Sequence, residues 1–181
     1  MRSPRLSRSP AFSPSARSRI LITMYAVRQW SVRNARGLEW LYNKFAATLL
    51  HLHPLFDRIG YDRLEAPMAS LERHIKGFMF DCHMCGQCAL RATGMACPMN
   101  CPKSLRNGPC GGVRPNGHCE VEPAMRCVWV EGWNGAQRMR QGHTISEIHN
   151  PLDHRLGETS SWLRVTREQS LVADADSDWT G

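Results

Sequence analysis

Cysteine is absent from most of this chain of 181 residues. The first 81 residues and the last 54 contain none, so all eight cysteines lie in the 46 residues from Cys82 to Cys127. A full-size barrel or dinucleotide-binding fold takes roughly 200 residues or more before any further module is added. The sequence therefore excludes such a catalytic core beside the cysteine region and predicts one small domain with appendages.

Acidic residues are absent from the first 23 residues, which hold five arginines. Removing these five from the 23 basic residues of the chain leaves 18 against 16 acidic residues. The net charge of +7 thus falls to +2 for residues 24–181. Binding to nucleic acid requires a concentrated basic face, so we predict no nucleic-acid partner, and we disfavour a nucleic-acid-binding zinc ribbon for the same reason.

Long apolar runs are absent as well. The run over residues 20–27 is much shorter than the roughly 20 residues that a membrane helix needs. It leads directly to Arg28 without the small-residue cleavage site of a secretory signal. We therefore predict no membrane span and a cytoplasmic protein.

Residues 1–23 are predicted to be a leader outside the fold. Residues 1–19 are Ser, Pro and Arg without hydrophobic periodicity, a composition that predicts disorder. A more protein-like stretch opens at Met24. The alternative is that Met24 is the true first residue and that the leader is a mis-called start.

Residues 24–76 are predicted to form a helical arm. Apolar residues recur there at steps of three and four, which indicates one face of a helix. They are Leu38, Leu41, Phe45, Leu49, Leu52, Phe56 and Ile59. Pro54 interrupts the pattern, so we expect one helix to end near His51 and a second to begin with Pro54 in its first turn and to end at Gly60.

A third helix is expected after Pro67, with Met68, Leu71 and Ile75 on its apolar face and Gly77 as its stop. The arm also carries Trp30, Trp40 and Tyr42. A single helical layer has little of its own to pack against. The arm is therefore expected either to complete a small core or to dock on a partner subunit, and the sequence does not separate the two.

Residues 77–133 are predicted to form a cysteine-rich domain. Two residues separate each of the first three cysteines, and the later gaps are 8, 3, 8, 8 and 7 residues. The candidate metal ligands are Cys82, Cys85, Cys88, Cys97, Cys101, Cys110, Cys119 and Cys127. A disulfide framework is the weakest interpretation, because it requires an oxidising compartment and usually a secretory signal.

Zinc and iron–sulfur chemistry both use such thiolates. Four-cysteine zinc sites commonly pair two CxxC knuckles. A CxxCxxC run is instead typical of an iron–sulfur cubane, in which it binds three corners. The fourth ligand is then a later cysteine, often in a Cys-Pro pair. Cys97 and Cys101 are both followed by proline. We expect two 4Fe–4S clusters, or one such cluster plus Zn. The first three cysteines are expected to share a site with a later one, and the pairing beyond that stays open, with His83 and His118 as neighbours able to substitute.

Turn signals in the same region predict short β-hairpins. The turn Asn116-Gly117 lies in a predicted hairpin over residues 113–121, and residues 127–130 read as a further strand. The predicted fold class is α+β: an N-terminal helical arm followed by a small, irregular, metal-stapled cysteine-rich domain. Residues 134–181 are expected to be a C-terminal extension with a loose acidic tail.

One run of residues carries a family resemblance. The pattern CxxCGQCxLxxTGxxCPMNCPKxLRNGPCGG, followed by NGHCEVEP and CVW, extends from about Phe80 to Trp133. It resembles the methylenetetrahydrofolate reductase C-terminal domain family, known also as the small accessory subunit of that reductase in acetogenic bacteria. The resemblance implies an iron–sulfur or zinc protein that joins a separate flavoprotein reductase in one-carbon metabolism through tetrahydrofolate.

The resemblance makes the eight cysteines the expected ligands and places the flavin in the partner. No catalytic residue is expected in this chain, which would relay electrons to the flavoprotein or stabilise it. Lys103, Arg106 and Asn107 lie in the matched run and either balance thiolate charge, face the flavoprotein or belong to a solvated loop. The alternative function is a zinc-held structural interaction module without a redox role.

Overall fold

The computed structural model describes the backbone of residues 14–178 and the side chains of residues 24–172. The α-helices of this part are α1 (Pro14–Arg33), α2 (Ala35–His51), α3 (His53–Ile59), α4 (Tyr61–Phe80), α5 (Val128–Ala136) and α6 (Ser161–Asp178). The short 3₁₀-helices are η1 (Pro98–Asn100), η2 (Gly142–Ser146) and η3 (His154–Leu156). The predicted disorder of residues 1–13 lies outside the described residues, whereas residues 14–23 belong to α1.

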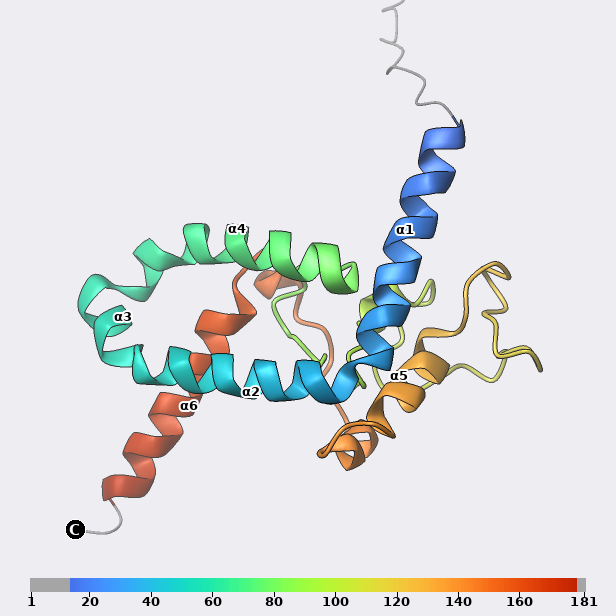
Figure 1. Ribbon diagram of the computed structural model, residues 1–181. Helices are drawn as coiled ribbons and strands as arrows, with labels where there is room; N and C mark the ends of the chain where they lie inside the picture. The colour runs from blue at the N-terminus through green and yellow to red at the C-terminus, as the bar shows by residue number, and fades with distance from the viewer. Residues whose placement is uncertain (1–13, 179–181) are drawn as a thin grey trace, which may run out of the picture.

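The helices form a bundle beside an irregular region (Figure 1). α2 and α4 run in opposite directions, α3 joins them at one end, and α6 packs against both. α1 leaves this layer at a steep angle and contacts α4 and α5. The cysteine-rich segment connects the end of α4 to the beginning of α5, and part of it extends outward beyond α5 (Figure 1).

Three apolar clusters of buried residues lie in the described part of the chain, and the two larger ones hold these parts together. One joins α2, α3 and α6 through the buried residues Leu49, Phe56, Trp162 and Leu163, with the rings of Phe45 and Trp162 edge to face at 4.7 Å. The other joins the arm to the cysteine region through Ala35, Phe80, Leu90, Met95, Cys97 and Met139. Burial of such apolar surface is the main force that holds a small domain together, so the cysteine region shares a core with the helices.

The predicted ends of the first two helices of the arm are confirmed. α2 ends at His51, and α3 has Pro54 in its first turn and ends before Gly60, whose φ of 96° is in the region that favours glycine. The third prediction is wrong at both ends, because α4 passes through Pro67 and continues three residues beyond Gly77. Packing of the face that follows Pro67 outweighs the local preference of proline.

The buried face of α4 is also not the predicted apolar one. Its buried residues are Ala69, Glu72, Lys76 and Phe80. Leu71 and Ile75, which were expected to face the core, are 52% and 42% exposed. The exposed apolar residues of α2 and α4 also include Trp40, Leu41 and Phe78. Docking of the arm on a partner stays a prediction.

The predicted α+β class is wrong, because no strand occurs within residues 14–178. The expected hairpin over residues 113–121 is a series of tight turns with one isolated bridge between His118 and Arg126. The Gly117 amide donates to the Arg114 carbonyl and the Cys119 amide to the Met125 carbonyl. These bonds close local loops and do not extend into a ladder.

The expected strand at residues 127–130 is instead the beginning of α5. This helix packs against the turn before Cys97 through Gly132 and Gly135, whose lack of a side chain permits close contact with Gly94. At the other end of the chain, α6 continues to Asp178, into the residues that were expected to form a loose tail. None of the helices over residues 14–178 combines the length and the apolar character that a membrane crossing requires.

Candidate functional site

All eight cysteines are free thiols. They lie in the irregular segment between α4 and α5, and each is buried or half-buried. The disulfide framework is therefore not the state that this structure adopts. The eight side chains gather around two separate cavities, four at each.

The first cavity is lined by Cys82, Cys85, Cys88 and Cys97. The chain reaches it from α4 through left-handed backbone at Asp81 and Met84, with φ values of 52° and 46°. This path turns the Met84 amide toward Cys82, where it donates to Sγ at 3.4 Å. Amides directed at sulfur in this way stabilise negative charge on thiolates.

Burial raises the pKa values of two thiols in the first cavity when no metal is bound. Burial is the main cause and neighbouring cysteines add to it: together they raise the pKa of Cys82 to about 11 and that of Cys97 to about 12. Without a cation these two groups hold their protons at neutral pH. A bound metal ion reverses this preference, because it deprotonates a coordinating thiol.

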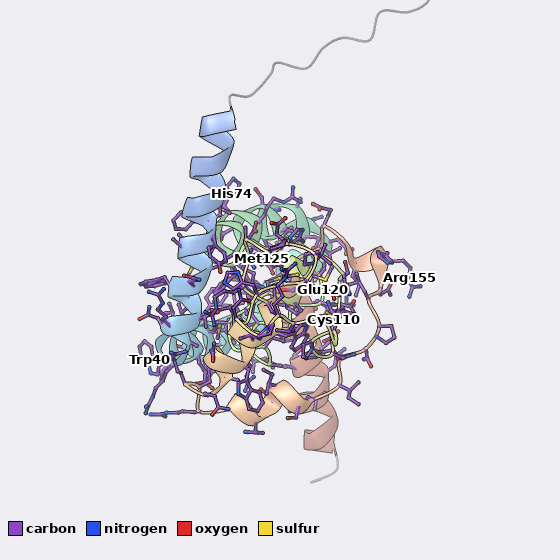
Figure 2. All side chains as sticks on the ribbon, turned by 90° about the vertical axis from the view of Figure 1, so that its right-hand side faces the viewer. Trp40, His74, Cys110, Glu120, Met125 and Arg155 are labelled. Atoms are coloured by element: carbon purple, nitrogen blue, oxygen red, sulfur yellow. The ribbon has the colours of Figure 1, made fainter. Side chains whose placement is uncertain are left out.

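The second cavity is lined by Cys101, Cys110, Cys119 and Cys127. Backbone bonds fix three of them, because Cys101 follows η1, the Cys119 amide donates to Met125 and the Cys127 amide donates to Gly117. Figure 2 shows Cys110 beside Glu120, and the Cys110 thiol donates to Glu120 Oε1 at 3.5 Å. Glu120 also forms an ion pair with Lys103.

Each cavity thus receives one of the two Cys-Pro pairs. Cys97-Pro98 lines the first cavity and Cys101-Pro102 the second. By the lining of the two cavities, the CxxCxxC run lies with the next cysteine along the chain, and the last four cysteines lie together. Over residues 24–172, no three His, Cys, Asp or Glu side chains are arranged as a group that could hold a metal ion, so the ligand role of the cysteines stays a prediction.

Arg106 lines the first cavity, and Arg28 lines a neighbouring pocket that shares Cys97 with it. Arg106 points Nη1 at Cys85 Sγ, 3.8 Å away, and donates from Nη2 to the Gln87 carbonyl at 3.1 Å. Arg106 Nε is buried without a hydrogen-bond partner. Arg28 lies near Cys97 and 3.6 Å from Asp81; burial lowers its pKa, and the nearby negative charges oppose that effect.

A buried ion pair completes the same cavity wall. Lys76 and Glu72 both line the cavity, at 2% and 1% exposure, and their Nζ and Oε1 atoms are 2.6 Å apart. Burial alone disfavours the charged form of Lys76. The negative charges of the Cys88 thiolate and Glu72 outweigh that effect, and the pKa of Lys76 is raised.

The three polar residues of the family run have different roles. Arg106 lies against the first cavity and Lys103 against the second. Asn107 is a structural residue, because its side chain donates to the His149 carbonyl at 3.0 Å and accepts from the His149 amide at 2.7 Å.

The two histidines beside the cysteines face other partners. His83 Nε2 lies 3.0 Å from Asn100 Oδ1, and His118 Nδ1 lies 2.7 Å from the Pro123 carbonyl. Neither residue lines one of the two cavities. In this structure both histidines therefore behave as neighbours of the cysteines.

Sequence reasoning missed Glu72 and Lys76. The signal was available in the steps of three and four that join Ala69, Glu72, Lys76 and Phe80 along α4. Charged residues normally lie on the exposed face of a helix. The sequence therefore predicted that Met68, Leu71 and Ile75 form the buried face, in place of the series that contains Glu72 and Lys76.

A family model described as "Methylene-tetrahydrofolate reductase C terminal" matches residues 61–155, slightly more than half of the chain. The match begins with α4 and contains both cavities' cysteines, Lys76 and Arg106. No curated protein matches the chain, and no solved structure does.

Proposed function

The chain belongs to the methylene-tetrahydrofolate reductase C-terminal family, and we propose that it is a cysteine-rich accessory subunit that holds two iron–sulfur clusters for a separate flavoprotein reductase. In this proposal the carbon chemistry, at the level of methylene- and methyltetrahydrofolate, belongs to the partner. This chain supplies ligands, shielding and a docking face. Free thiols of this kind persist in a reducing compartment such as the cytoplasm.

The observation that carries the proposal is the grouping of the eight cysteines four and four. A cubane cluster takes four thiolates, so two such groups match two clusters without a surplus or a missing ligand. The first group unites the CxxCxxC run with a Cys-Pro cysteine, which is the combination that iron–sulfur proteins use.

The surroundings of the first cavity fit an anionic group. A cluster bound by four thiolates carries negative charge. Arg106 lines this cavity, together with the ion pair of Lys76 and Glu72. The Met84 amide donates to Cys82 Sγ, and the positive end of its dipole would also stabilise negative charge there. When bound, the clusters would take up and release single electrons, and the chain's own residues would exclude water and fix the charge around them.

The second cavity supports a variant of the proposal. Its cysteines have no CxxC pair, and Glu120 lies against Cys110. A zinc ion there, with a cluster in the first cavity, leaves the accessory role intact. Zinc in both cavities would instead make the chain a structural interaction module.

The proposal is tested by metal analysis of the full chain purified without oxygen. We expect iron and acid-labile sulfide in stoichiometric amounts and a broad brown absorption, and we expect the flavoprotein reductase to be retained by the tagged chain. Colourless protein that contains only zinc would overturn the redox role.

Single and paired Cys→Ser variants test the grouping. Cys85→Ser and Cys97→Ser should each remove the same half of the metal, and combining them should remove no more. Cys85→Ser with Cys119→Ser should remove all of it. A different pattern of additivity would contradict the assignment of Cys97 to the first cavity.

A further inference from the structure

A large open cavity lies between α2 and the segment that follows α5. Its volume is about 590 Å³, within the range of roughly 300–1,000 Å³ that is typical of small-molecule sites. Arg36, Trp40 and Lys44 line it from α2, and Arg140 and Gln141 line it from the segment before η2. None of the cysteines lines this basic cavity, so it is separate from the two cysteine cavities.

The helical spacing of α2 gathers its contributions on one face. Arg36, Trp40 and Lys44 are four residues apart, and side chains at that spacing lie above one another on a helix. All three residues are exposed, Trp40 by 61%. Figure 2 shows Trp40 at the outer edge of the molecule, away from Cys110. The indole is therefore accessible to a ligand, with a cation one helical turn away on either side.

A buried carboxylate places Arg140 beside this face. Glu39 is 2% exposed, and its two oxygens accept from the Arg140 amide at 2.8 Å and from the Gln141 amide at 2.9 Å. The Gln141 side chain is held in turn by Arg91, whose Nε donates to Oε1 at 2.9 Å. The backbone at Arg140 is therefore fixed against α2 before any ligand binds.

Positive charge exceeds negative charge around the basic cavity. Three cations and one carboxylate line it, which leaves a net charge of +2. The carboxylate is Glu39, which already accepts from two backbone amides. Within residues 24–172, the side chains of Arg36, Lys44 and Arg140 take part in no ion pair. Cations that converge on one cavity attract anions, and guanidinium groups bind phosphate or carboxylate oxygens in pairs.

We propose that the basic cavity binds a small ligand in which a flat ring carries two or more negative charges, the chemistry of a nucleotide. The Trp40 indole would stack on the ring, and the three cations would bind the charged groups. A bare anion would use the cations alone and leave the indole uncovered. The α2 part of the cavity precedes residues 61–155, which the family model matches. The inference therefore depends neither on the proposed function nor on a metal.

Isothermal titration calorimetry of the full chain with ADP at low salt tests the inference. We expect saturable binding of one ADP per chain, and weaker binding both of pyrophosphate, which lacks the ring, and of adenosine, which lacks the phosphates. Arg36→Ala should lower the affinity for ADP and for pyrophosphate about tenfold, whereas Trp40→Ala should lower that for ADP alone. Trimesate, a benzene ring with carboxylates, separates the two sources of charge: tighter binding of trimesate than of ADP would identify a carboxylate ligand.

Trp133→Ala and Arg58→Ala are the matched controls. Trp133 on α5 is 54% exposed and Arg58 on α3 is exposed, but neither lines the basic cavity. Both control variants should bind ADP as the wild type does, and all four variants should retain the wild-type unfolding temperature because the replaced side chains are exposed. The inference is overturned if neither ADP nor trimesate binds saturably, or if Arg36→Ala or Trp40→Ala binds the preferred compound as tightly as the wild type.

Discussion

The carbonyl oxygen of Gly94 lies where the β-carbon of any other residue at position 135 would be. A Cβ built on Gly135 comes within 1.9 Å of that oxygen, and one built on Gly94, whose φ is 61°, comes within 2.0 Å of the Gly132 carbonyl. The backbones of α5 and of the turn before Cys97 are therefore in direct contact. This contact fixes the path of the chain that leads to Cys97.

Gly135→Ala is expected to destabilise the protein by about 1–3 kcal/mol, because a methyl group at this contact forces the two backbones apart. Urea unfolding of the wild type and the variant under the same metal conditions measures the difference. Gly37→Ala is the control: it lies in α2 with nothing within 4 Å of its Cβ, so it should stabilise the protein by about 0.5–1 kcal/mol. Equal effects at the two positions would contradict the contact.

Glu39 holds the segment after α5 onto α2. It is 2% exposed, and its carboxylate accepts from the amides of Arg140 and Gln141 at 2.8 and 2.9 Å. Glu39→Ala leaves two amides without an acceptor, at about 1–3 kcal/mol for each unsatisfied group. We expect the free energy of unfolding to fall by about 2–4 kcal/mol.

Glu168→Ala is the control for Glu39→Ala. Glu168 forms an ion pair with Arg164 at 2.6 Å, but its side chain is 58% exposed. Such surface pairs contribute about 0–1 kcal/mol. If the two alanine variants lose the same stability in urea unfolding, the buried role of Glu39 is wrong.

The sequence predicted those features of the fold that are set by local chemistry. Pro54 and Gly60 limit α2 and α3 through their own backbone geometry. The predicted hairpin failed because Asn116-Gly117 specifies a turn and not the ladder that must follow it. The prediction of a strand at residues 127–130 was wrong because a tertiary contact between α5 and Gly94 favours a helix there. The periodicity of the sequence carries no information about that contact.

The sequence identified eight cysteines as candidate ligands, and the lining of the two cavities divides them into two groups. The spacing of Cys82, Cys85 and Cys88 keeps them close along the chain, and all three line the first cavity. Which later cysteine joins them depends on the path through Gly94 to Cys97, and no spacing rule specifies it. Lys76 escaped notice because its burial depends on partners from α6, which lie far away in the sequence.

Metal-free protein is expected to lose stability at alkaline pH. Burial raises the pKa of Cys82 to about 11 and that of Cys97 to about 12, from an ordinary value of 9.0. A thiol with a higher pKa in the folded state binds its proton more tightly there. Its contribution is complete below pH 9.0 and is lost as the pH rises through the folded-state values.

Urea titrations with chelator and reductant measure this effect. The free energy of unfolding should be constant with respect to these two groups below pH 9.0 and should fall above it. Cys97→Ala removes the more strongly shifted thiol, so its stability should fall less steeply over the alkaline range. Equal slopes for the variant and the wild type would contradict the burial of a protonated Cys97.

Gly86 lines the first cavity, and its replacement should alter that cavity and leave the second one intact. Its φ is 71°, and a Cβ there would lie 2.1 Å from the Leu156 carbonyl oxygen. Gly86→Ala should therefore displace the loop between Cys85 and Cys88 at a cost of about 1–3 kcal/mol.

If the first four cysteines hold a cluster, Gly86→Ala lowers its occupancy and leaves that of the second cavity unchanged, so iron and sulfide per chain fall toward half. Gly111→Ala is the matched control, since Gly111 adjoins Cys110 of the second cavity and has nothing within 4 Å of its Cβ. That variant should retain its full metal content. A parallel loss of metal from both cavities would mean that the two groups of cysteines do not form independent sites.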